Sequence, residues 1–159
     1  CGRRTATGTP EEGLAIARLF VPKGTLAMRE GKAGARETVT AGSGDGAVTL
    51  PAVVLIDIGT AGAAELFASA LSGNGRADLI GEHTMGRAAT QKLMKLPDGS
   101  GLWLSTTRYL MPDGTPLHEK GLEPKIAVDE PTLDFGQAPP AADTMLDKAL
   151  EQFSVKRAA

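Results

Sequence analysis

Residues 52–80, AVVLIDIGTAGAAELFASALSGNGRADLI, carry the strongest signal for the fold class. This stretch opens with an apolar run rich in β-branched residues at 52–58, which predicts a strand buried on both faces of a parallel sheet. Small residues over 61–71 predict a helix, with Gly73 just beyond as its terminator. Residues 77–80 predict a second buried strand. Strand, helix and strand in this order form a βαβ crossover, so the sequence predicts an α/β fold.

A second helix is predicted upstream, directly after Thr9. Thr9 is a good N-cap, Pro10 suits the first helical position, and Glu12 completes a Thr-x-x-Glu capping box. Two short alternating stretches, 25–29 and 36–40, then predict strands separated by a glycine turn.

Downstream of the crossover the pattern becomes antiparallel. Residues 91–96 and 102–107 flank a Pro-Asp-Gly-Ser-Gly turn and predict a hairpin, in which Trp103 is expected to lie in the core or an interface. Residues 126–128 predict a short edge strand, and 134–141 predict a tether. A helical apolar stripe near the C-terminus is formed by Leu146, Ala149, Leu150 and Phe153.

Composition excludes several classes of function. The 159 residues fit one domain, and 17 Lys and Arg against 19 Asp and Glu supply no basic face for nucleic acid or an anionic membrane. No apolar run approaches the ~20 residues of a membrane span. The single cysteine, Cys1, excludes an internal disulfide, and the spacing of His83 and His118 matches no metal-ligand pattern. We therefore predict neither a metal nor a cofactor.

Eight short strings occur in a fixed order along the chain. They are LFVPKG (19–24), GTAGAAE (59–65), GRA (75–77), GEHTMGR (81–87), LPDG (96–99), TRY (107–109), PDG (112–114) and KGLEP (120–124). With this ordered set, the chain resembles the carboxyl-terminal processing peptidases, or tail-specific proteases, over roughly residues 3–128. The resemblance implies a Clp-protease/crotonase-like core with βαβ units, followed by antiparallel strands and a C-terminal helix.

The resemblance also implies where the family's chemistry lies. Its members use a Ser/Lys dyad, in which a neutral lysine takes the serine proton and the serine attacks a peptide carbonyl. The serine position here is Gly62 and the lysine position is Arg87, 25 residues later as in the family. The family's glutamine four residues after the lysine is retained as Gln91. The backbone N–H groups of Gly8 and Ala63 match the family's oxyanion donors.

These two substitutions predict a peptidase-like domain that binds or scaffolds peptides, or assembles with partners, without cleaving. Gly62 has no nucleophile, and Arg87, with a pKa above ~12, cannot act as a general base. Rescue by Thr60 or Ser69 is disfavoured, because Thr60 suits a helix N-cap and Ser69 lies about 10 Å along the helix. Two alternatives stay open: an active serine-type endopeptidase in altered or truncated form, and a crotonase-like acyl-thioester enzyme using Glu65.

The sequence leaves two interpretations of Arg87. Its guanidinium has the geometry to bind a peptide's C-terminal carboxylate with two hydrogen bonds, or it forms a structural ion pair with Glu65 or Asp57. The ion pair is slightly favoured. Similarly, Gly62 and Gly8 either leave room for a bound carbonyl or carboxylate, or serve only packing and the end of a strand.

Both histidines are expected to lie outside the chemistry. His83 adjoins Glu82, but neighbouring residues on an extended segment point to opposite faces, which argues against a triad with Ser69 or Thr84. His118 lies in a Pro/Gly-rich turn and is expected at the surface.

We expect a core domain over residues 1–130, a linker over 131–141, and a C-terminal helix and tail over 142–159. The start has no initiator methionine, so we expect a longer protein, and the resemblance implies an upstream PDZ-like domain. It further implies a peptide or protein C-terminus as partner, allows a homo-oligomer, and implies a location outside the cytoplasm.

Overall fold

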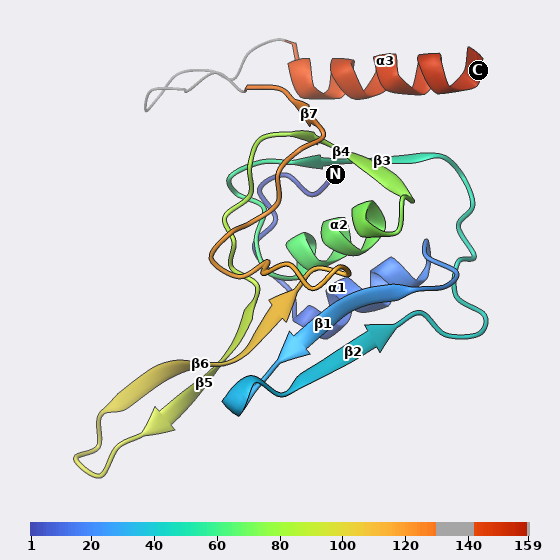
Figure 1. The fold of residues 1–159 in the computed structure, drawn as a ribbon. Helices are drawn as coiled ribbons and strands as arrows, with labels where there is room; N and C mark the ends of the chain where they lie inside the picture. Colours follow the sequence, from blue (N-terminus) through green and yellow to red (C-terminus); the bar gives the residue numbers. More distant parts are fainter. Residues whose placement is uncertain (130–141, 159) are drawn as a thin grey trace.

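The computed structural model of the chain describes residues 1–129 and 142–158. In chain order the elements are α1 (Pro10–Arg18), β1 (Thr25–Glu30), the 3₁₀ turn η1 (Lys32–Gly34), β2 (Arg36–Thr40), β3 (Ala52–Ile56), α2 (Ala63–Gly73), β4 (Ala77–Gly81), β5 (Ala89–Lys95), β6 (Gly101–Leu110), β7 (Ile126–Ala127) and α3 (Thr144–Ala158). Over the described residues, the strands form two sheets with the orders β2-β1-β6-β5 and β3-β4-β7 (Figure 1). The predicted α/β class is confirmed.

The predicted βαβ crossover is present in the second sheet. β3 and β4 are parallel, with Val54 opposite Leu79, and α2 connects them. α2 begins at Ala63, later than predicted. The prediction of Gly73 as terminator is wrong, because Gly73 is still helical and the left-handed residue beyond the helix is Gly75, with φ +64°.

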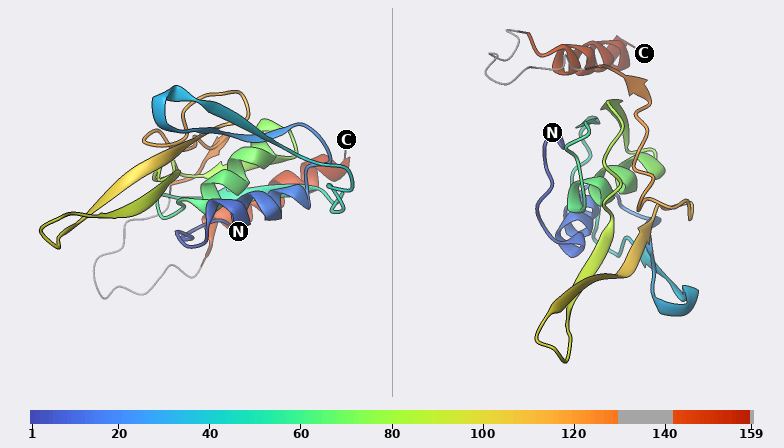
Figure 2. Two further views of the ribbon diagram at one scale, coloured as in Figure 1. Left: turned by 90° about the horizontal axis from the view of Figure 1, so that it is seen from below. Right: turned by 90° about the vertical axis from the view of Figure 1, so that its left-hand side faces the viewer.

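Both faces of the β3-β4-β7 sheet are covered, as the unbroken apolar run predicts. On one face, Val54 and Ile56 pack into the main core with α1, α2 and β1. On the other face, Leu55 packs with Met145 and Ala149 of α3 in a smaller cluster. α3 therefore lies across the sheet from α2 (Figure 2). In the predicted C-terminal stripe only the position of Ala149 is buried, because α3 turns Met145 rather than the leucines toward the sheet.

The first helix brings the N-terminal part of the chain against α2. Its predicted capping box is confirmed, since the Thr9 side chain accepts from Glu12 N–H while Glu12 accepts from Thr9 N–H. Gly13 allows a very close approach of α1 and α2, because a β-carbon there would lie 2.3 Å from the Ala63 carbonyl oxygen. α1 thus packs directly on the first turn of α2.

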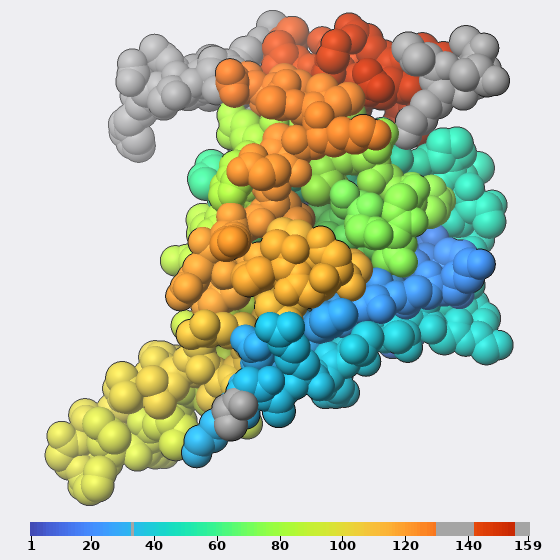
Figure 3. Space-filling view, viewed as in Figure 1, coloured from blue at the N-terminus to red at the C-terminus, as the bar shows by residue number. Residues whose placement is uncertain are grey.

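The predicted hairpin is formed by β5 and β6, which extend as a ribbon away from the rest of the molecule (Figures 1 and 3). Trp103 is 63% exposed, so its prediction as a core residue is wrong and its prediction as an interface residue stays open. The large apolar residues exposed on the ribbon are Leu93, Met94, Leu102, Trp103 and Leu104.

The last described segments complete the second sheet. β7 pairs with β4, with Ile126 opposite Ile80, and forms the predicted edge strand. The expected linker and tether (131–141 and 134–141) lie outside the described residues. No helix within the described part is long and apolar enough to cross a membrane.

Candidate functional site

Four positions singled out in the sequence line one pocket of about 210 Å³: Gly8, Gly62, Ala63 and Arg87. A β-carbon built on Gly62 would lie 3.8 Å from the Arg87 carbonyl oxygen, so the two positions are neighbours in space. The rest of the lining is apolar: Ala6, Pro10, Ala61, Leu66, Ala88 and Ala89. Gln91 is not part of this lining.

Gly62 lies immediately before α2 in a conformation that favours glycine. Its φ of 60° and ψ of −117° fall in a region that residues with a β-carbon rarely adopt. The space beside it is nevertheless open, since only the Arg87 carbonyl oxygen approaches within 4 Å. The pocket therefore has room for a ligand atom where another residue would place its side chain.

The buried carboxylate of Glu65 joins the start of α2 to the segment that carries Arg87. One oxygen, Oε2, accepts from Gly62 N–H at 3.0 Å and from Arg87 N–H at 2.8 Å. The other, Oε1, accepts from Gly86 N–H at 2.6 Å and from the Thr84 hydroxyl at 2.5 Å. With four donors satisfied and no exposure, Glu65 is a structural bridge. This arrangement argues against Glu65 as an acid/base.

The predicted ion pair of Arg87 with Glu65 or Asp57 is wrong. Glu65 binds the backbone N–H of Arg87, and Asp57 accepts from Arg4 N–H and the Thr60 hydroxyl. The Arg87 side chain is exposed and has no hydrogen bond or ion pair within residues 1–129 and 142–158. Its guanidinium is therefore available to a ligand.

Two residues that line the pocket, Gly8 and Ala63, have backbone N–H groups that could serve a ligand. In the described part of the chain neither has a hydrogen-bond acceptor. The two residues are neighbours in space, because a β-carbon on Gly8 would be 3.3 Å from the Ala63 β-carbon. The Ala63 N–H is also at the N-terminus of α2, where the helix dipole favours an anion.

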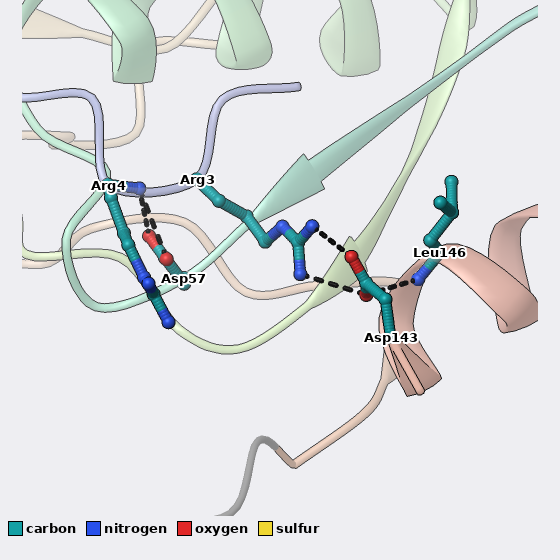
Figure 4. A network of polar contacts seen from close by, with 5 residues as sticks. All are labelled: Arg3, Arg4, Asp57, Asp143 and Leu146. Atoms are coloured by element: carbon teal, nitrogen blue, oxygen red, sulfur yellow. Dashed lines mark hydrogen bonds and ion pairs between the residues drawn. The ribbon is translucent and has the colours of Figure 1, made fainter. Parts of the chain in front are cut away.

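A polar network fixes the segment that leads to Gly8 (Figure 4). Arg4 N–H donates to both carboxylate oxygens of Asp57, and Arg3 forms a two-bond ion pair with Asp143. Hydrogen bonds from Arg3 and from Leu146 N–H lower the pKa of Asp143. The segment is thus tied both to the end of β3 and to α3.

Neither hydroxyl considered as a substitute nucleophile is placed to act. Thr60 is fully buried and its hydroxyl bonds to Gly2 and Asp57. Thr60 is also not the N-cap of α2, contrary to the prediction, because the helix begins after Gly62. Ser69 is buried, has no partner among the described residues, and does not line the pocket.

The histidines are not brought to the pocket. His83 is 44% exposed, and its Nε2 lies 2.7 Å from the Lys120 carbonyl oxygen. His118 is partly buried, with 18% of its side chain exposed, so its expected surface position is met only in part. Within the described residues, no group of three or more His, Cys, Asp or Glu side chains is arranged to hold a metal ion.

Comparison with known proteins shows to which protein family the chain belongs. Residues 3–128 match peptidase family S41, and the chain belongs to this family. It is 36% identical to a carboxyl-terminal-processing protease of Synechocystis sp., over 94% of this chain and 35% of the relative. It is also 36% identical to the carboxy-terminal processing protease CtpA of Bacillus subtilis, over 83% of this chain and 28% of that protein.

Among solved structures, the chain is similar to the photosystem II D1 C-terminal processing protease. The TM-score is 0.70 at 34% identity, covering 80% of this chain and 33% of that one. The resemblance stated from the sequence is therefore confirmed for the family and the fold. The chain spans about a third of the length of these relatives.

Proposed function

We propose that this domain binds peptide C-termini in the pocket around Gly62 without cleaving them. One observation carries the proposal: the pocket brings Gly62 and Arg87 together in an otherwise retained family framework. A hydroxyl nucleophile and a neutral amine are required for the family's reaction. Glycine supplies no nucleophile, and a guanidinium keeps its proton.

The polar groups of the pocket match a carboxylate. The N–H groups of Gly8 and Ala63 have no partner in the described structure, and the unpaired guanidinium of Arg87 can donate two parallel hydrogen bonds. An amide carbonyl at the same place would gain the N–H bonds but not the charge-assisted pair. The small volume of about 210 Å³ favours a short terminal side chain.

The test compares two peptides of one sequence, ending in alanine as a free acid or as an amide. We expect calorimetric titration to give at least tenfold tighter binding of the acid. One hydrogen bond to a charged group contributes about 1.5–3 kcal/mol, and a tenfold difference in affinity corresponds to about 1.4 kcal/mol. Arg87→Gln should remove the preference. Arg36→Gln, at an exposed arginine that pairs with Glu30 on another face, is the matched control. Equal affinity for acid and amide, or no binding, overturns the proposal.

A second candidate is an active serine-type endopeptidase of which this chain is an altered form. It is favoured by the spatial adjacency of positions 62 and 87 and by the open space beside Gly62. The double change Gly62→Ser with Arg87→Lys should then restore cleavage of an unstructured peptide. If the double variant stays inert, more than the dyad separates this chain from an active peptidase.

The remaining expectations rest on the resemblance and on the relatives' names. We propose an upstream PDZ-like domain in a longer protein, a substrate or ligand protein with a free C-terminus, and work outside the cytoplasm. A homo-oligomer is compatible with the apolar ribbon of β5 and β6. Sequencing the full gene and measuring the mass of its product in solution would test the domain and the oligomer.

A further inference from the structure

One carboxylate, that of Asp143, connects the C-terminal helix to the N-terminal segment. Its Oδ1 accepts from Leu146 N–H at 2.9 Å, the bond expected of a residue that caps α3. The same side chain accepts two hydrogen bonds from the guanidinium of Arg3, at 3.0 Å to Oδ1 and 2.5 Å to Oδ2 (Figure 4). Asp143 thus has two separable roles, helix capping and the binding of Arg3.

The segment that starts at Arg3 ends at the pocket. Arg4 N–H donates to Asp57, and Ala61 N–H donates to the Thr5 carbonyl oxygen at 2.9 Å. The second bond joins the segment to the residue directly before Gly62. Gly8, three residues beyond Thr5, then lines the pocket.

We infer that Asp143 is a positioning residue for this pocket, acting through Arg3 on the segment that carries Gly8; the inference rests on the proposed function. The Asp143 pair holds Arg3 on the side of the sheet covered by α3, while Asp57 holds the next residue at the end of β3. Because the side chain of Arg3 and the N–H of Arg4 are both held, the backbone that leads from them to Gly8 has fewer conformations. The orientations of the Gly8 N–H are therefore limited. Loss of the Arg3 contact leaves that donor less ordered and weakens carboxylate binding. α3 thereby contributes to a site that none of its own residues line.

Two conservative variants separate positioning from helix capping. Asp143→Asn keeps an efficient N-cap acceptor but loses the charged pair with Arg3. Asp143→Glu keeps the charge that Arg3 needs but is a poor N-cap. Lys148→Ala is the control, because it removes an exposed ion pair with Glu151 on the same helix.

The readouts are the affinity for the free-acid peptide and amide hydrogen exchange of residues 1–8 and of Ala61. We expect Asp143→Asn to weaken binding about three- to tenfold and to speed exchange, with a smaller effect at high salt. Asp143→Glu and Lys148→Ala should resemble the wild type in both. The reverse order, with Asp143→Glu impaired and Asp143→Asn normal, means that Asp143 only caps α3 and overturns the inference.

The two proposals fail in different ways. If the wild type binds the acid and Asp143→Asn binds it equally well, the positioning role is wrong and the proposed function stands. If the wild type binds no peptide, the proposed function is wrong. The exchange data then decide the inference alone: unchanged protection of Ala61 in Asp143→Asn overturns it, and faster exchange supports the link from α3 to the segment.

Discussion

Replacing Gly62 by serine should destabilise the protein, although the resemblance to the family places a serine at this position. The backbone of Gly62 has φ 60° and ψ −117°. Holding a residue with a β-carbon in such a conformation costs about 1–3 kcal/mol. Serine also restricts the unfolded chain, which returns about 0.4–1 kcal/mol. The net loss of unfolding free energy should therefore be about 1.3 kcal/mol at the middle of both ranges, and at most about 2.6 kcal/mol.

Steric crowding adds little to this loss. The new β-carbon would meet only the Arg87 carbonyl oxygen, at an ordinary contact distance of 3.8 Å. The control is Gly31→Ser, because Gly31 has φ −95° and a β-carbon there would lie 4.0 Å from its nearest neighbour, the Ala35 carbonyl oxygen. That variant meets no such strain, so its unfolding free energy should stay the same or rise by up to about 1 kcal/mol.

Urea unfolding followed by circular dichroism measures both changes in unfolding free energy. In thermal unfolding, each kcal/mol should shift the midpoint temperature by about 2–4 °C. If Gly62→Ser is as stable as Gly31→Ser, the backbone at position 62 carries no strain. The idea that glycine relieves strain at this position would then be refuted.

Three further predictions concern packing, the buried carboxylate and pH. Gly13→Ala should cost about 1–3 kcal/mol in urea unfolding, despite the better helix propensity of alanine, because its β-carbon would lie 2.3 Å from a carbonyl oxygen of α2. Glu65→Gln should lower the free energy of unfolding by about 2–4 kcal/mol, because the amide NH₂ cannot accept hydrogen bonds from the backbone N–H groups it faces. The control Glu37→Gln, at an exposed ion pair, should lower it by less than about 0.5 kcal/mol. For Asp143, the Arg3 hydrogen bond lowers the pKa in the folded state below the unfolded value of about 3.9. The stabilisation of the folded state by the Asp143 carboxylate is therefore present above that pH, and it is lost as the pH falls through the folded-state pKa. The difference in urea midpoint between wild type and Asp143→Asn should therefore be constant from pH 7 to 5 and shrink below about pH 4; a constant difference down to pH 2 would contradict the assignment.

Most of the helices and strands could be predicted from the sequence, because the patterns that specify them lie within a few neighbouring residues. The apolar run at 52–58 and the capping box at Thr9 each depend on neighbouring residues only. The exact end of α2 was missed, since both Gly73 and Gly75 satisfy the same composition rule and only the backbone angle distinguishes them. The orientation of α3 was also missed, because Met145 and the neighbouring leucines are equally apolar.

The candidate site was predicted only in part. Adjacency of Gly62 and Arg87 followed from ordered strings that match a family, not from spacing alone. The role of Glu65 was missed because its partners are backbone N–H groups, whose directions are set by the folded loop rather than by residue type. Trp103 shows a further limit: alternation places it on a strand face, but nothing in the strand says what covers that face.

The most direct measurement is mass spectrometry of an unstructured peptide after incubation with the wild-type protein. Since position 62 offers no nucleophile and position 87 no base, we predict that the peptide stays intact while it binds. Peptide fragments that form in proportion to the protein, and that disappear when Arg87 is changed to glutamine, would show that this domain does cleave peptides.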